Sequence, residues 1–258
     1  MSQDSTKLKD KVVLITDINT DIAKQTALFC AAQGASLVIN GPGGEPACFQ
    51  KKILSITGQV LFTNQDVSIF ENGKYLIETA IDKYQKLDAL INTSYFRVDK
   101  SLKNIDPKEF YASVRYGLKS IFVTTRFACK FFRKQGFGSI VNMTSNAGLG
   151  IEDSIAYSAT SEGIIGMTRT VARDMAKYGV TCNAICPGNI ESASILAASL
   201  CLESMQFISG RTFGTENESI FIYQEPRPIS TISKWGGFEL EELQTIVPKT
   251  IDKNISAK

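Results

Sequence analysis

The chain has 258 residues, with 28 basic and 26 acidic side chains and no histidine. A chain of this length buries roughly 70–75% of its unfolded surface on folding, so it needs no disulfide or metal ion to stabilise its core. A net charge of +2 is too small to indicate nucleic-acid binding. Histidine is the commonest metal ligand and general base, so we expect no metal site, and any chemistry falls to Ser, Tyr, Lys, Cys or carboxylates.

Short β-branched runs alternate with longer segments in which apolar residues recur every three or four positions. The expected strands are 12–16, 36–40, 60–63, 87–92, 139–144, 180–186 and 219–223. The expected helices are 21–33, 46–57, 69–85, 107–134, 156–178 and 194–207. The run Val12 to Ile15 is apolar at consecutive positions, which indicates strands buried on both faces. We predict an α/β fold with a doubly wound, seven-stranded parallel sheet in three α/β/α layers.

The stretch after Pro226 differs from the rest, because prolines and Gly236-Gly237 precede a short acidic helix at 239–247. We therefore expect one domain over 1–225 and a carboxyl-terminal extension over 226–258, packed on the domain or on a partner.

The six cysteines form no C-x-x-C pair, and several lie in apolar stretches such as Val180 to Cys186, so they are interpreted as buried structural thiols. Met1 to Lys11 is polar, and no stretch approaches the ~18 apolar residues of a membrane span. These features predict a cytoplasmic, soluble protein that binds no membrane.

Ligands of doubly wound sheets bind at the carboxyl ends of the strands. The loops at these ends contain four short sequence motifs. They are Asn142 to Gly148, Tyr157-Ser158-Ala159, Gly163 to Arg169 and Asn183 to Gly188. Together and in this order they resemble the short-chain dehydrogenase/reductase family, from about residue 8 to residue 225. The resemblance implies a Rossmann-like fold, an NAD(P) cofactor and assembly through the helices 107–134 and 156–178.

Strand one of the family ends in T-G-x-x-x-G-x-G, which lets a pyrophosphate sit on the first helix. Here the glycine positions hold Asp17, Asp21 and Ala23. A carboxylate ~4 Å from a phosphate costs on the order of 4 kcal/mol at an effective dielectric near 20, or roughly a thousandfold in affinity. Asp21 or Thr20 could instead simply cap the helix. Either way, we expect this chain to bind no dinucleotide.

The adenosine side departs from the family pattern too. No acidic residue follows strand two, where Asn40 leads into a glycine-rich loop, and Tyr95 stands where the family has a glycine after strand four. Asp66 matches an adenine-side residue, although it could equally cap the next helix.

The family's catalytic set of Asn, Ser, Tyr and Lys is half present. Ser145 and Tyr157 match, whereas Ser161 occupies the lysine position and Gly117 the asparagine position. Without a nearby cation, Tyr157 should titrate near its reference pKa of about 10, so that only about one molecule in a thousand is phenolate at pH 7. Alternatively, Ser145 and Tyr157 are packing residues whose hydroxyls bond each other. The lid loop after Pro187-Gly188 is also short.

The end of the domain resembles 3-hydroxyacyl-CoA dehydrogenases, which places the chain near acyl-CoA oxidation. Our leading hypothesis is a non-catalytic subunit that supports a catalytically intact, NAD-carrying homologue in a heterotetramer. The 2-(hydroxybenzyl)succinyl-CoA dehydrogenases of anaerobic toluene breakdown pair an active with an inactive subunit, and this chain resembles the inactive one. The alternatives are an atypical active oxidoreductase that uses Tyr157 and Ser145, and a ligand-sensing regulatory module that signals through the tail.

Overall fold

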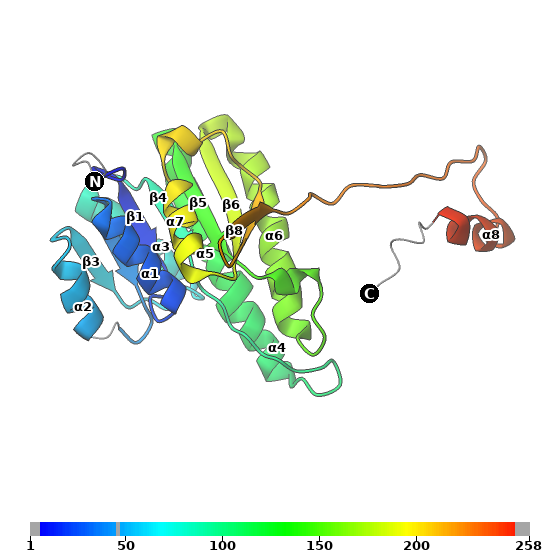
Figure 1. Ribbon diagram of the computed structural model, residues 1–258, viewed down its shortest axis with the longest axis horizontal. Coiled ribbons are helices and arrows are strands. Elements are labelled where there is room, and N and C mark those ends of the chain that lie inside the picture. The colour runs from blue at the N-terminus through cyan, green and yellow to red at the C-terminus, as the bar shows by residue number, and fades with distance from the viewer. Residues whose placement is uncertain (1–5, 45–46, 251–258) are drawn as a thin grey trace. The chain divides into compact units, whose positions relative to one another are not determined.

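The computed structural model describes residues 6–44 and 47–250 (Figure 1). Contacts divide the chain into two units, Met1–Tyr223 and Gln224–Lys258. The first unit holds the sheet and the helices around it. The second is a segment without regular structure up to α8 (Leu240–Thr250), which covers most of the expected helix at 239–247.

The sheet has eight strands in the order β3-β2-β1-β4-β5-β6-β7-β8. All neighbours from β3 to β7 pair in parallel, and β8 pairs antiparallel with β7. The strands are β1 (Val12–Ile15), β2 (Ser36–Asn40), β3 (Val60–Thr63), β4 (Ala89–Asn92), β5 (Gly138–Met143), β6 (Val180–Pro187), β7 (Thr212–Glu216) and β8 (Ser219–Ile222). The predicted doubly wound α/β fold is confirmed.

Helices cover both faces of the sheet (Figure 1). One core cluster joins the sheet to α1 (Asp21–Ala32), α2 (Ala47–Leu54) and α7 (Ile190–Ser199). The other joins it to α3 (Phe70–Tyr84), α5 (Ser120–Gln135) and α6 (Ile155–Met175). Val13 and Ile15 point into the first cluster and Val12 and Leu14 into the second, which explains why β1 is apolar at every position.

The strand count is where the prediction was wrong. Residues 219–223 were expected to form the last parallel strand, but they form the antiparallel β8, and β7 precedes them. Gly214 in the middle of β7 weakens its strand signal, because glycine is depleted in strands. The ring of Phe221 on the paired strand lies over this glycine, since a Cβ at position 214 would be 2.3 Å from it unless the ring moved.

The expected helix 107–134 is interrupted. It begins as α4 (Pro107–Ser113), widens into a π-helical turn, η1 (Val114–Lys119), and continues as α5. Gly117 lies in this turn. A π-helical turn inside a helix often marks a functional site, and this one faces the loop after β4. The expected helix 194–207 was misplaced at both ends. It begins at Ile190, because the Asn189 side chain caps it by accepting the N–H of Ser192, and it ends at Ser199, ahead of a 3-10 turn at Glu203–Met205.

Candidate functional site

The turn after β1 keeps a tight shape without its glycines. Asp17 adopts a left-handed φ of 49°, which aspartate tolerates better than most residues. The N–H of Thr20 donates to the carbonyl of Asp17, and the hydroxyl of Thr20 accepts the N–H of Ala23 at 3.2 Å. Thr20 is therefore the cap of α1, and Asp21 is its exposed first residue.

The turn carries two carboxylates and one occupied helix N–H at the place where the family pattern puts a pyrophosphate. The amino end of a helix binds phosphate through free N–H groups, and here the side chain of Thr20 already occupies the N–H of Ala23. The carboxylate of Asp17 is partly buried, and burial raises its pKa although the backbone N–H of Asn19 acts against the rise. Asp21 adds a second carboxylate to the same turn.

The loops after β1 and β2 contact each other directly. The side-chain amide of Asn19 donates to the carbonyl of Pro42 at 3.1 Å. Ile18 is fully buried against Gly41, at which a Cβ would lie 2.5 Å from its methyl carbon. Asn40 is buried and uses its side-chain amide to hold Gln65 and Thr63, so it has no free acceptor for a ribose.

Asp66 was left open between an adenine-side residue and a helix cap. Its carboxylate accepts the N–H of Ser68 at 2.9 Å and pairs with Arg115 at 3.2 Å, while α3 begins at Phe70, after Ile69. Asp66 therefore closes the turn before α3 and ties it to η1, rather than capping the helix.

Ser145 and Tyr157 meet at the carboxyl end of β5. Ser145 precedes a short 3-10 turn and accepts the N–H of Ala147 at 3.1 Å. Burial is the largest influence on the pKa of Tyr157 and raises it above 10.0, while a hydrogen bond with Ser145 and the charge of Arg97 act against the rise. The expected pKa near the reference value was therefore wrong, because burial raises the pKa of Tyr157 above it.

Two catalytic positions of the family are changed in place. Ser161, at the lysine position, is 2% exposed, and its carbonyl accepts the hydroxyl of Thr144 at 2.9 Å. Gly117 occupies the asparagine position. A Cβ added there would lie 3.9 Å from Thr160 and 4.0 Å from the backbone nitrogen of Phe96, which is ordinary contact distance. The structure brings these positions to the same end of the sheet as Tyr157, but neither supplies the expected side chain.

Arg97 is a residue that the sequence reasoning missed. Its guanidinium lies 5.8 Å from the ring centroid of Tyr157, so a cation does stand near the tyrosine, contrary to expectation. Asp99 holds Arg97 at 2.7 Å, and Ser154 donates to Asp99 at 2.5 Å. Arg97 lies outside the motifs of the resemblance, and no spacing rule in the sequence points to it.

Tyr95 faces Tyr157 across a cavity of about 260 Å³ at the mouth of the changed cofactor crevice. The two ring centroids are 6.5 Å apart, and Thr20, Asp21 and Arg97 also line the space. Tyr95 thus fills part of the room that a glycine would leave.

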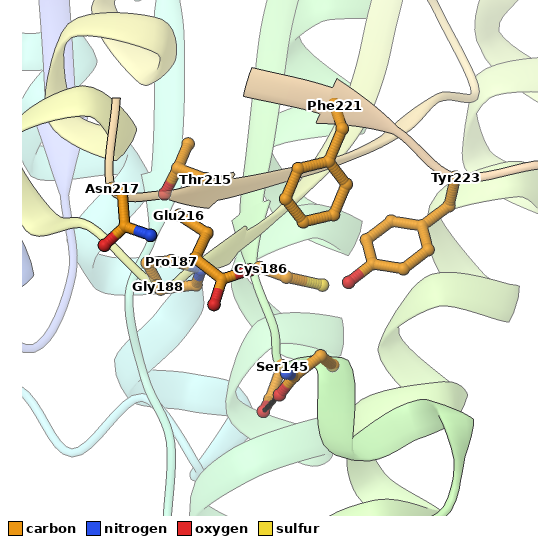
Figure 2. Close-up of a pocket in the computed structure, with 10 residues that line it drawn as sticks. Ser145, Cys186, Pro187, Gly188, Thr215, Glu216, Asn217, Phe221 and Tyr223 are labelled. Atoms are coloured by element: carbon orange, nitrogen blue, oxygen red, sulfur yellow. Dashed lines mark hydrogen bonds between the residues drawn. The ribbon is translucent and has the colours of Figure 1, made fainter. Parts of the chain in front are cut away.

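A second cavity of about 260 Å³ lies on the other side of Ser145, under the β7–β8 hairpin (Figure 2). Figure 2 shows the hydroxyl of Tyr223 directed at the thiol of Cys186, with the ring of Phe221 beside it. Burial raises the pKa of Cys186 to about 12, and its hydrogen bond with Tyr223 acts against the rise. This thiol is therefore a packing group and not a nucleophile at neutral pH.

The other cysteines are free thiols. Cys30, Cys182 and Cys201 are buried as predicted, whereas Cys48 is exposed. Within residues 6–44 and 47–250, no group of three metal-ligating side chains comes together, and no helix is long and apolar enough to cross a membrane.

Residues 11–199 match the family model of the short chain dehydrogenases, so the chain belongs to the short-chain dehydrogenase family. It is 33% identical over 217 residues to a 3-oxoacyl-[acyl-carrier-protein] reductase of Synechocystis, covering 83% of this chain and 87% of the relative. It is 29% identical to the (2S)-[(R)-hydroxy(phenyl)methyl]succinyl-CoA dehydrogenase subunit BbsD of Thauera aromatica, over 72% of this chain and 75% of that one.

A third relative is the peroxisomal hydratase-dehydrogenase-epimerase of Saccharomyces cerevisiae, 34% identical over 69% of this chain and 21% of that longer protein. Among solved structures, a short chain dehydrogenase from Mycobacterium avium superposes with a TM-score of 0.88 at 28% identity, covering 95% of both chains.

Proposed function

We propose that this chain is the non-catalytic subunit of a heteromeric short-chain dehydrogenase that acts on a hydroxyacyl-CoA, and that a homologous subunit carries NAD and the chemistry. The observation that carries the proposal is the turn after β1. It presents the carboxylates of Asp17 and Asp21, and it uses Thr20 to occupy a helix N–H that a phosphate would need.

The catalytic positions support the same proposal. Ser161 cannot supply the charge that the family's lysine brings to the tyrosine, and burial keeps the pKa of Tyr157 above its ordinary value. A phenol that stays protonated at neutral pH is a poor general base. Ser145 and Tyr157 then remain as a hydrogen-bonded pair that packs the end of β5.

The relatives favour an acyl thioester as the substrate of the complex. Two of them are named for acyl-carrier-protein or CoA substrates, the reductase of Synechocystis and BbsD of Thauera aromatica. We place this chain in the cytoplasm beside such an enzyme, with NAD on the partner subunit.

The proposed contact with the partner is formed by the helices 107–134 and 156–178, in a heterotetramer. Along these helices Phe132, Ile164 and Met175 are buried in the core and are not available to a partner. Phe122 is exposed, as are Tyr111, Tyr116 and Ile155. Gly166 lies in open space on the same helix, which allows a partner backbone to approach closely.

Co-expression with a homologue that has intact glycines and an intact Y-x-x-x-K tests the proposal. We expect the two chains to co-purify with dehydrogenase activity that survives Tyr157→Phe in this chain. The same substitution at the partner's tyrosine should abolish it. Loss of activity on Tyr157→Phe here, with the complex intact, would contradict the proposal.

Arg97 favours a second candidate, an active oxidoreductase that uses Tyr157 and Ser145. A guanidinium 5.8 Å from the Tyr157 ring centroid could take over part of the missing lysine's charge. Hydride transfer by the isolated chain that Tyr157→Phe abolishes, and that Arg97→Ala weakens, would establish this candidate instead.

A further inference from the structure

The cavity of about 260 Å³ that Tyr95 and Tyr157 face is lined entirely by residues of the first unit. The centroids of the two rings lie 6.5 Å apart, and their planes meet at 53°. Four apolar side chains complete the walls: Ile22, Met143, Pro187 and Ile190. Aromatic and aliphatic walls of this kind suit the apolar body of a small molecule.

Most polar side chains of this cavity already have partners within the chain. The hydroxyls of Thr93 and Thr144 donate to backbone carbonyls, and the hydroxyl of Thr20 accepts a backbone N–H at the cap of α1. The hydroxyl of Tyr157 bonds with Ser145. These groups are satisfied by the fold itself, so they do not define what the cavity binds.

Arg97 is the lining residue that still has strong donors to offer. Its Nε donates to both carboxylate oxygens of Asp99, at 3.0 and 2.7 Å, and Ser154 donates to Asp99 in turn. In the part of the chain that the structure describes, the two terminal nitrogens of Arg97 have no hydrogen-bond partner. A guanidinium that is fixed through its Nε presents its remaining N–H groups as a fork, which matches the two oxygens of a carboxylate.

The charges around Arg97 limit how many negative groups a ligand can carry. Asp99 offsets part of the Arg97 charge. Asp21 also lines the cavity, but its side chain is 83% exposed and lies 3.8 Å from Lys24, so its charge is screened. A second anionic group on the ligand would add repulsion from Asp21. One carboxylate is therefore favoured over a dicarboxylate or a phosphate ester.

We infer that this cavity binds a small organic monocarboxylate. The carboxylate of the ligand accepts from the terminal nitrogens of Arg97, and its apolar body packs against the rings of Tyr95 and Tyr157. The inference goes beyond the proposed function, which assigns this chain no ligand of its own.

Titration of the isolated full-length chain with 3-phenylpropionate, followed through the NMR signals of the ligand, tests the inference. We expect a dissociation constant below about 1 mM. The amide, 3-phenylpropionamide, has the same shape without the charge and should bind roughly tenfold more weakly, because it cannot form the charged fork. Equal binding of acid and amide, or no saturation by the acid up to about 10 mM, would overturn the inference.

Substitutions locate the bound carboxylate. Arg97→Gln should reduce the affinity for the acid to that for the amide, whereas Tyr95→Ala should weaken both ligands alike. Arg133→Gln is the matched control, because the Arg133 guanidinium also lies over a tyrosine, 4.8 Å from the ring centroid of Tyr178, but outside this cavity. An Arg97→Gln chain that still binds the acid as tightly as the natural chain would contradict the inference. The comparison of acid with amide needs no variant, so it does not depend on how a substitution folds.

A parallel titration with NAD separates this inference from the proposed function. If the chain binds neither 3-phenylpropionate nor NAD, the inference fails and the proposed function stands. If the chain binds both, the inference stands and the proposed function fails.

Discussion

Asp17 is a carboxylate at a left-handed turn position inside a partly buried loop. Because burial raises its pKa in the folded chain above the ordinary 3.8, the folded state holds the proton more tightly than the unfolded state. The resulting stabilisation is fully present below pH 3.8 and is lost as pH rises through the folded pKa.

Asp17→Asn should therefore stabilise the protein at pH 7 relative to the natural chain, and the gain should vanish below pH 3.8. Asparagine tolerates the left-handed φ and keeps an acceptor for the N–H of Asn19. Urea unfolding at both pH values measures the effect, with Asp21→Asn as an exposed control. Equal gains at both pH values would refute the assignment of a buried charge.

Tyr157 gives the second prediction at this scale. The difference in ultraviolet absorbance between the natural chain and Tyr157→Phe reports the Tyr157 phenolate, which should form only above pH 10 because burial raises the pKa. Arg97→Ala should move this titration to still higher pH, since the Arg97 charge lowers the pKa. Lys100→Ala, at a surface pair with Glu109, should leave it unchanged. A phenolate at neutral pH would instead favour the active oxidoreductase.

Single residues also explain which parts of the site the sequence could predict. Asp17, Asp21, Ser161 and Tyr95 stand in motifs of fixed spacing, so their positions at one end of the sheet follow from the pattern. Arg97 lies outside those motifs. Its place over Tyr157 depends on the path of the loop after β4 and on Asp99, which only the folded chain brings together.

The cap at the start of α1 is central to the proposal that this chain binds no phosphate there. Thr20→Ala removes the hydroxyl that accepts the N–H of Ala23 and should cost about 1 kcal/mol of unfolding free energy. Thr170→Ala, on an exposed part of α6, should change stability by a few tenths of a kcal/mol at most. Urea midpoints measure both, and equal effects would mean that Thr20 is not the cap.

Strands and helices with strong periodicity could be predicted closely; β2 and β3 begin and end where the sequence placed them. Elements shaped by distant contacts could not. In β7, Gly214 lies under the ring of Phe221 of its partner strand. The long helix before β5 widens into η1, and no proline in the sequence marks the change. In both places tertiary packing outweighs local propensity.

At the scale of the whole molecule, an intact short-chain dehydrogenase fold surrounds a crevice whose phosphate, ribose and lysine positions are all changed. The sheet, the two core clusters and the outer helices keep the form of the family. We therefore propose that this chain binds no dinucleotide itself and serves the assembly of a partner enzyme.

Isothermal titration of the isolated full-length chain with NAD, NADH and their phosphorylated forms tests this claim most directly, with an intact family member as the positive control. We predict no binding heat from this chain at ligand concentrations that saturate the control. Dissociation constants in the micromolar range would contradict the account.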